Sequence, residues 1–195
     1  MMTEPITGIV LSGGAGRRMG SVDKGLELLA GHPLVEHVLR RLGPQVDEIL
    51  ISANRNRDRY ERLGFRVIAD STPGFAGPLA GLEACMAEAS HAWVMTVPCD
   101  SPFLPMDLAV RLRLPMQDGA DVAIAKTGDR SHPVFCLCRR ALRPHLQAFL
   151  AQGGRRFEEW CRTLQLAEVA FDDEADAFRN LNSRDDLRRS EAAPD

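Results

Sequence analysis

The chain has 195 residues, of which 45% are apolar and 26% charged, and a formal net charge of -3. This length suits one domain, residues 1–195, that buries a substantial core without disulfides or metals. The weak negative charge and the 6% aromatic content exclude a broad basic face with stacking rings, so no nucleic-acid partner is expected.

The first predicted element is an apolar strand, residues 9–11, that runs into a glycine-rich loop. Glycines let the backbone of such a loop approach a ligand and point several N–H groups into one concavity, which binds anions. Arg17, Arg18 and Lys24 add three formal positive charges within eight residues. Because the whole chain is acidic, these cations are local, and the loop predicts a polyphosphate ligand.

Two common phosphate-binding motifs do not match this loop. A P-loop requires G-x-x-x-x-G-K-[ST], but the positions five after Gly13 and Gly14 are Arg18 and Met19. A Rossmann fingerprint requires G-x-G-x-x-G, but counting from Gly14 puts Met19 at the third glycine, and the next strand ends in residues 52–54 without the ribose-binding acid. A dinucleotide ligand is therefore disfavoured.

Strands and helices alternate along the rest of the chain. The predicted strands cover residues 9–11, 48–52, 66–69, 93–100, 121–126 and 133–138. The predicted helices cover residues 33–42, 58–63, 105–112, 140–151 and 157–164, with a further helix that begins at residue 78. This alternation predicts an α/β fold, a single Rossmann-like three-layer domain with a mainly parallel sheet.

Polar residues follow four of the predicted strands. Ligands of parallel sheets bind beyond the carboxyl ends of the strands, so Ser12, Asn54, Asp70 and Asp100 should line one crevice. Ser52 lies on the same strand face as Asn54 and is an alternative to it. Mg²⁺ prefers a carboxylate together with phosphate oxygens and water, so we assign Asp100 as its ligand, with Mn²⁺ as a substitute. A cap of the following turn is the local alternative for this aspartate.

The sequence contains no signal for export or membrane anchoring. The first twenty residues lack a signal-peptide pattern, and no later apolar run approaches the ~20 residues that span a bilayer. The five cysteines form no C-x-x-C pair, which indicates buried thiols rather than a disulfide framework or a zinc site. We expect a cytoplasmic protein without a membrane partner, and we expect it to be a monomer.

Four segments carry a resemblance to a known family, and one of them is Pro98 to Asp100. The first loop reads L-[SA]-G-G-x-x-x-R-M-G-x-x-D-K-x-L, which resembles the signature of nucleotidyltransferases and, more narrowly, of the molybdenum cofactor guanylyltransferase family. Gly77 to Gly81 resembles the second nucleotide-contacting segment of the family. Phe178 to Leu187 resembles its F-x-N-[VIL]-N-T-P-x-D-L close, with Ser183 and Arg184 where Thr and Pro are usual.

The resemblance implies a nucleotidyltransferase fold and transfer of GMP from GTP to the phosphate of molybdenum-bound molybdopterin, with release of pyrophosphate. The implied catalytic residues are Arg18, Lys24 and Asp100. The implied nucleotide-binding residues are Leu11, Ser12, Gly13, Gly14, Lys24, Asn54, Asp70, Gly77, Pro78, Leu79 and Asp100. The implied acceptor-binding residues are Arg130, His132, Asn180 and Asn182. Residues 1–105 would bind the nucleotide and residues 106–190 the acceptor, with molybdoenzyme chaperones or molybdenum-insertion proteins as protein partners.

Two alternatives remain open. A molybdopterin cytidylyltransferase, or another small-molecule nucleotidyltransferase, would use a similar loop, although Gly13-Gly14 and the Asp23-Lys24 pair favour the guanylyl enzyme by resemblance. A GTP-binding adaptor without chemistry would also use the loop. Asp100 argues against an adaptor, because a metal ion is most useful when charge moves.

Overall fold

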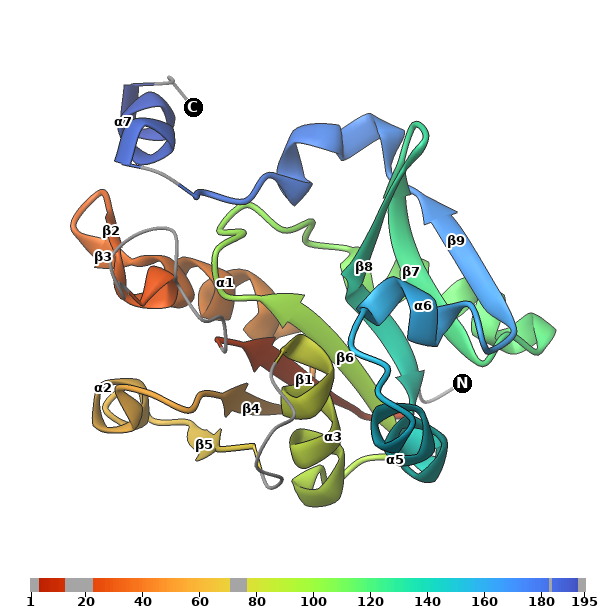
Figure 1. Cartoon of the computed structure of the whole chain (residues 1–195). Helices are drawn as coiled ribbons and strands as arrows, with labels where there is room; N and C mark the ends of the chain where they lie inside the picture. The colour runs from red at the N-terminus through yellow and green to blue at the C-terminus, as the bar shows by residue number, and fades with distance from the viewer. Residues whose placement is uncertain (1–3, 13–22, 71–76, 183, 193–195) are drawn as a thin grey trace.

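A seven-stranded sheet with helices on both faces organises the protein (Figure 1). The computed structural model describes residues 4–12, 23–70, 77–182 and 184–192. The strands of the sheet are β1 (Ile6–Leu11), β4 (Glu48–Ser52), β5 (Arg66–Ile68), β6 (Trp93–Pro98), β7 (Val122–Thr127), β8 (Arg130–Arg139) and β9 (Leu166–Ala170). A separate hairpin consists of β2 (Leu28–Leu29) and β3 (His32–Pro33).

The α-helices of the described residues connect these strands. They are α1 (Leu34–Leu42), α2 (Arg57–Glu61), α3 (Pro78–Glu88), α4 (Leu108–Arg113), α5 (Arg143–Ala151), α6 (Phe157–Cys161) and α7 (Arg184–Ala192). Short 3-10 helices are η1 (Lys24–Leu26), η2 (Gly43–Gln45), η3 (Leu114–Asp118), η4 (Arg140–Leu142) and η5 (Asp172–Phe178). Within the described ranges, no helix combines the length and the apolar character that crossing a membrane requires.

The strand order is β5-β4-β1-β6-β8-β7-β9. β5, β4, β1 and β6 pair in parallel, as do β7 and β9, whereas β8 is antiparallel to both of its neighbours. β8 is reversed because it follows β7 through a tight turn, in which Gly128 has a φ of 51° and Thr127 pairs with Arg130. The predicted α/β fold with a mainly parallel sheet is confirmed.

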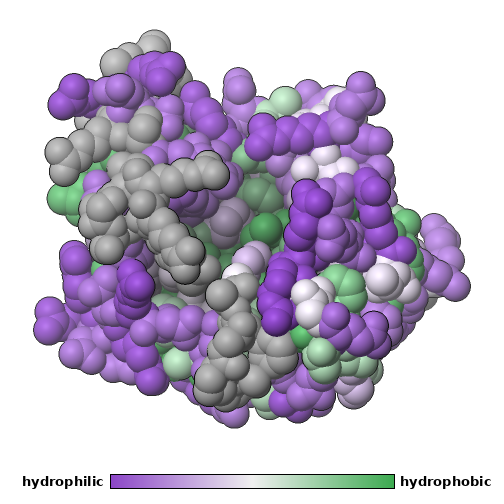
Figure 2. Space-filling model, viewed as in Figure 1, coloured by the Kyte–Doolittle hydropathy of each residue, from purple (hydrophilic) through white to green (hydrophobic). Residues whose placement is uncertain are grey.

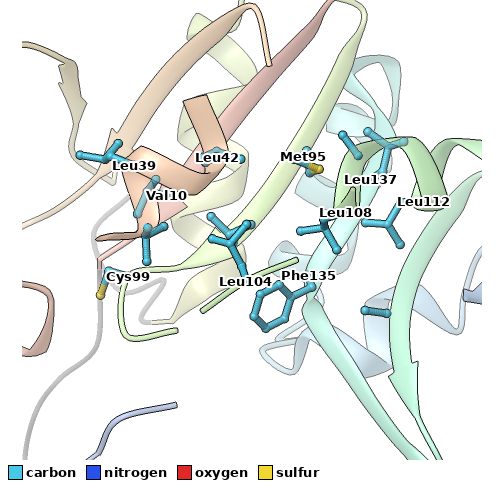
Figure 3. Close-up of a cluster of buried hydrophobic side chains, with 14 of the residues drawn as sticks. Val10, Leu39, Leu42, Met95, Cys99, Leu104, Leu108, Leu112, Phe135 and Leu137 are labelled. Carbon is cyan, nitrogen blue, oxygen red and sulfur yellow. The ribbon is translucent and has the colours of Figure 1, made fainter. Parts of the chain in front are cut away.

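Both faces of the sheet are apolar. In β1, Ile6 and Val10 belong to the core cluster on one face, and Ile9 and Leu11 belong to the cluster on the other. α1 and α4 cover the first face, and α3, α5 and α6 cover the second (Figure 1). Figure 3 shows part of the first cluster, which joins Val10 to side chains of α1, α4 and β8. Burial on both faces explains why the central strands are continuous apolar runs in the sequence.

Some elements differ from the sequence predictions. β9 is not predicted because its five residues, LAEVA, include one β-branched side chain and form a half-exposed edge strand. β2 and β3, with two residues each, are too short to give a periodic pattern. β8 begins at residue 130 rather than 133, because the strands of its hairpin stay paired up to the turn.

Gly81 allows α3 to lie close to the sheet. A Cβ added there would lie 2.2 Å from the Ser52 Oγ and 3.3 Å from the Leu11 Cδ2. We therefore expect Gly81→Ala to lower the free energy of unfolding by about 1–3 kcal/mol, since helix or strand must shift to accommodate the methyl group. Denaturant unfolding measures this change. Gly43→Ala is the matched control, because Gly43 has helical backbone angles and open space around its added Cβ. Equal losses of stability in the two variants would contradict this explanation.

Candidate active site

The carboxyl ends of four parallel strands meet at one edge of the sheet. Ser12, Asn54, Asp70 and Asp100 follow β1, β4, β5 and β6, as the sequence predicts. Figure 2, viewed as in Figure 1, shows a face that is hollowed near its centre, with hydrophobic side chains in the floor and hydrophilic ones around the rim. Asp100 and the pair of Asn54 and Asp70 lie at these strand ends.

Asp100 contacts residues from both ends of the chain. Its Oδ2 lies 3.5 Å from the Nζ of Lys24, and the same Nζ donates a hydrogen bond of 2.5 Å to the Oδ1 of Asn182. The backbone N–H of Leu181 donates to the Asp100 carbonyl at 2.9 Å. The sequence predicts catalytic and nucleotide-binding roles for Lys24 and Asp100 and an acceptor-binding role for Asn182, and the three side chains meet at one point. We call these three side chains the Lys24–Asp100–Asn182 junction.

Among the described residues, the positive charge next to the Asp100 carboxylate only partly offsets the effect of its burial. Its side chain is 12% exposed. Burial raises the pKa of Asp100 above the ordinary value, and the Lys24 ammonium lowers it but offsets only part of the effect. A further cation near Asp100 would therefore stabilise its ionised form.

The Asp100 carboxylate is a suitable ligand for a magnesium ion that binds together with phosphate groups. Within the described ranges, no group of three or more His, Cys, Asp or Glu side chains is placed to hold a metal. Mg²⁺ commonly uses one or two carboxylates, substrate phosphates and water, and Mn²⁺ accepts similar ligands. A single buried carboxylate whose charge is only partly offset suits this type of binding and does not suit a metal held by protein ligands alone.

Asn54 and Asp70 form a pair across the ends of β4 and β5. The Asn54 Nδ2 donates to the Asp70 Oδ2 at 2.8 Å, and the Asp70 backbone N–H donates to the Asn54 Oδ1 at 2.8 Å. Burial raises the pKa of Asp70, the bond from Asn54 lowers it, and the charge of Glu83 raises it further. Ser52, the alternative to Asn54, is 2% exposed and packs under Gly81. The two predicted nucleoside residues are therefore together, and Ser52 is part of the core.

The backbone at the start of α3 has a conformation that would let a ligand approach it closely. Gly77 adopts φ 127° and ψ 175°, a conformation that residues with a Cβ rarely adopt, and Pro78 occupies the first helical position. The side chains of Leu79 and Leu11 are buried in the core on the α3 face. Leu11 and Leu79 would therefore offer main-chain atoms to a ligand rather than their side chains.

Residues 8–168 match the family model described as the MobA-like NTP transferase domain. The chain belongs to this family. It is 47% identical over 195 residues to the molybdenum cofactor guanylyltransferase of Cupriavidus taiwanensis, with 97% of this chain and 98% of that protein covered. It is 44% identical over 185 residues to the molybdenum cofactor guanylyltransferase of Shewanella putrefaciens, with 94% and 95% covered. Molybdopterin-guanine dinucleotide biosynthesis protein A from Archaeoglobus fulgidus superposes with a TM-score of 0.77 at 26% identity, over 95% of this chain and 96% of that chain. The resemblance inferred from the motifs is confirmed, and the protein is a nucleotidyltransferase.

In this MobA-like chain, His132 is largely buried at the β7–β8 hairpin. Its Nε2 lies 2.8 Å from the Thr127 Oγ1, and its ring stacks on Phe178 with centroids 4.7 Å apart. Burial lowers the pKa of His132 and the charge of Arg130 lowers it further, which favours the neutral ring. Arg130 is exposed. His132 thus packs the hairpin onto the closing segment, and an acceptor role for His132 and Arg130 stays a prediction.

Asn180 and Asn182 attach the closing segment of the family to the end of β6. The Asn180 Oδ1 accepts a hydrogen bond of 2.9 Å from the Ser101 hydroxyl, and Asn182 accepts one from Lys24. The backbone N–H of Asn182 donates to the Asp186 Oδ2 at 3.2 Å, in the first turn of α7. Both amides therefore hold the segment beside Asp100, and direct contact of either with the acceptor stays a prediction.

One residue next to this site, Tyr60, is not predicted from the sequence. Tyr60 is buried, and its hydroxyl donates to the Asp23 Oδ1 at 2.6 Å. The available signal was the single tyrosine of the chain, in a helix whose other residues are charged.

Gly13, Gly14 and Arg18 lie outside the described residues, so their assignment to phosphate stays a prediction.

Proposed function

We propose that the protein transfers GMP from GTP to the phosphate of molybdenum-bound molybdopterin and releases pyrophosphate. The names of relatives that match almost the whole chain support this proposal. The observation that carries it is the Lys24–Asp100–Asn182 junction, where an ammonium lies beside a buried carboxylate and offsets only part of the cost of its burial. This arrangement suits the cleavage of a triphosphate more than passive binding, because cations matter most where negative charge develops.

The proposed reaction is one in-line displacement at the α-phosphorus of GTP. A phosphate oxygen of molybdopterin forms the new P–O bond. The bond from the α-phosphorus to the α,β-bridging oxygen breaks, and pyrophosphate leaves with the electron pair. Both reactants are anionic, so the main tasks are to reduce repulsion and to hold attacking and leaving groups in line. No covalent enzyme intermediate is needed.

The phosphates are assigned to the first loop and to the junction. Lys24 and Arg18 stabilise the negative charge on the leaving pyrophosphate, and the backbone N–H groups of Gly13 and Gly14 bind phosphate oxygens. Asp100 is the residue that would hold Mg²⁺ or Mn²⁺, which supplies additional charge neutralisation to phosphate oxygens when bound. Removal of the Lys24 ammonium or the Asp100 carboxylate should therefore affect the rate more than the binding of GTP.

The nucleoside is assigned to Asn54 and Asp70. Guanine presents a ring N–H and an amino group on one edge, and a carboxylate can accept hydrogen bonds from both. Cytosine offers an amino donor but no ring N–H beside it, so the Asn54–Asp70 pair supports GTP over CTP.

Residues 1–105 would bind the nucleotide. Residues 106–190, with Arg130, His132, Asn180 and Asn182, would bind the acceptor, in a cytoplasmic monomer that works with molybdoenzyme chaperones or molybdenum-insertion proteins.

Pyrophosphate release from GTP, with and without molybdopterin, tests the proposed function. We expect release that depends on the acceptor and that is supported much better by GTP than by CTP. GTP binding without acceptor-dependent release would favour the adaptor, and equal or better use of CTP would favour the cytidylyltransferase. Either result would overturn the proposal.

Removal of divalent cations should abolish the transfer. In this proposal Asp100 is the protein ligand of the metal, and the described residues form no cluster of three or more metal ligands, so the ion should exchange easily and EDTA should strip it without unfolding the protein. We expect added Mg²⁺ or Mn²⁺ to restore the full rate, measured as pyrophosphate release, with an unchanged melting temperature throughout. Full activity in excess EDTA would contradict the role assigned to Asp100.

A further inference from the structure

Asp23 is held by two side chains from a single helical turn. Its Oδ1 accepts the hydrogen bond of 2.6 Å from the Tyr60 hydroxyl, and its Oδ2 accepts one of 3.0 Å from the Asn56 Nδ2. Asn56 directly precedes α2 and has a left-handed backbone with φ of 50°, and its carbonyl accepts from the backbone N–H of Tyr60 at 3.3 Å. We call Asp23, Asn56 and Tyr60 the Asp23 anchor. Both carboxylate oxygens are thus bound by one short helix and the residue that caps it.

The Asp23 anchor fixes the turn that carries Lys24. The Asp23 carbonyl accepts from the backbone N–H of Leu26 at 3.1 Å, which closes η1 around Lys24. Gly25 packs so closely that an added Cβ would lie 2.6 Å from the Tyr60 hydroxyl and 3.1 Å from the Cys99 Sγ. The turn is therefore enclosed between α2 and Cys99, the residue that follows β6 and directly precedes Asp100.

We propose that Tyr60 is a positioning residue for the transfer reaction, which acts through Asp23 to hold the Lys24 ammonium at the junction with Asp100 and Asn182. This inference rests on the proposed function, because it assigns to Lys24 a role in that reaction. Lys24 has a long side chain, and fixing its position costs conformational entropy. Asp23 directly precedes Lys24, and the hydrogen bonds to both Asp23 carboxylate oxygens restrict the backbone from which the Lys24 side chain extends.

The chemistry of the Asp23 anchor is consistent with positioning over a wide pH range. Burial is the main reason that the pKa of Tyr60 lies above its ordinary value, and the neighbouring Cys99 and Asp23 add to this effect. The hydroxyl therefore remains a hydrogen-bond donor at any pH where the enzyme works. Its ring belongs to the core cluster of α1 and α4, so Tyr60→Phe removes the hydroxyl and keeps the ring packing.

The first test is the kinetics of Tyr60→Phe. We expect kcat for GMP transfer to fall about tenfold, with the KM for GTP changed less than about threefold, because a displaced Lys24 affects the leaving group more than ground-state binding. Thr96→Val is the matched control, since it removes another hydroxyl of a buried residue, one that donates to the Val134 carbonyl at 2.6 Å in the middle of the sheet. Its kcat should remain within about twofold of that of the unaltered protein.

The second test asks whether Tyr60 acts through Lys24. In a Lys24→Ala background, measured by single-turnover transfer at high enzyme concentration, Tyr60→Phe should cost less than about twofold, because no ammonium is left to position. Asn56→Gly removes the other donor of the Asp23 anchor and keeps the left-handed backbone. It should lower kcat in the same direction as Tyr60→Phe, and it serves if the phenylalanine variant fails to fold.

The outcomes separate this inference from the proposed function. No acceptor-dependent transfer by the unaltered protein would overturn the proposed function and with it the basis for positioning. Normal transfer by the unaltered protein, with an equal kcat in Tyr60→Phe or Asn56→Gly, would overturn the positioning role alone. A loss from Tyr60→Phe that is as large in the Lys24→Ala background as in the unaltered protein would also overturn it, because the hydroxyl would then act by another route.

Discussion

Asp100→Ala should lower kcat for GMP transfer by about 10³-fold while GTP binding stays measurable. Asp100 is the single carboxylate at the junction, and its burial leaves it in need of a cation. The change is local, because the bond from the Leu181 N–H goes to the Asp100 carbonyl and does not involve its side chain. Single-turnover transfer gives the rate, and GTP titration gives the affinity. A kcat near that of the unaltered protein would remove Asp100 from the mechanism.

Asp100→Asn separates a loss of activity from a loss of folding. Because the pKa of Asp100 is raised in the folded state, folding favours its protonated form. The contribution of this group to stability is therefore present at low pH and is lost as the pH rises through the folded-state pKa. An asparagine side chain does not ionise, so its contribution to stability is not lost as the pH rises. The melting temperature of the variant at pH 7 should therefore equal or exceed that of the unaltered protein, while its transfer rate falls sharply. A lower melting temperature would show that the carboxylate stabilises the fold.

Lys24→Ala should slow the transfer by about 10²-fold to 10³-fold, with Lys24→Arg as a partial rescue. The Lys24 Nζ lies between Asp100 and Asn182, so its removal takes away positive charge from the point where the leaving group is expected. A guanidinium restores the charge but is larger and planar, and it cannot reproduce both contacts in the same geometry.

The chain offers a matched control for this experiment. Lys126 is the only other lysine of the sequence, and it pairs with Glu168 at 3.1 Å on the β7–β9 side of the sheet. Lys126→Ala removes the same charge and should leave the transfer rate within about twofold. Equal rates in Lys24→Ala and Lys126→Ala, measured as pyrophosphate release, would reduce Lys24 to a surface charge.

The central part of the fold could be predicted because its strands are buried on both faces. β4 and β6 consist of apolar runs that end in polar residues, so both the strands and the positions of Asn54 and Asp100 follow from the sequence. The half-exposed β9 lacks such a run, and its pairing with β7 depends on a neighbour more than 40 residues away. Local patterns carry no information about that partner.

The sequence motifs point to individual residues of the candidate site but not to their arrangement. The motifs single out Lys24, Asp100 and Asn182, yet the bond between Lys24 and Asn182 joins residues 158 positions apart. Tyr60 has no motif around it, and its role follows from the contact of its hydroxyl with Asp23. Such long-range contacts are decided by how the strands and the closing segment pack, which a linear pattern does not specify.

The most direct test is to follow the individual phosphates of GTP during the reaction. With GTP labelled at the α-phosphorus, the label should enter a molybdopterin dinucleotide, and with GTP labelled at the γ-phosphorus it should leave as pyrophosphate, both at rates that collapse in Asp100→Ala and Lys24→Ala. Appearance of the α-label in GDP, or of the γ-label in inorganic phosphate in the absence of a pyrophosphatase, would show cleavage at a different bond. That result would contradict GMP transfer at the Lys24–Asp100–Asn182 junction.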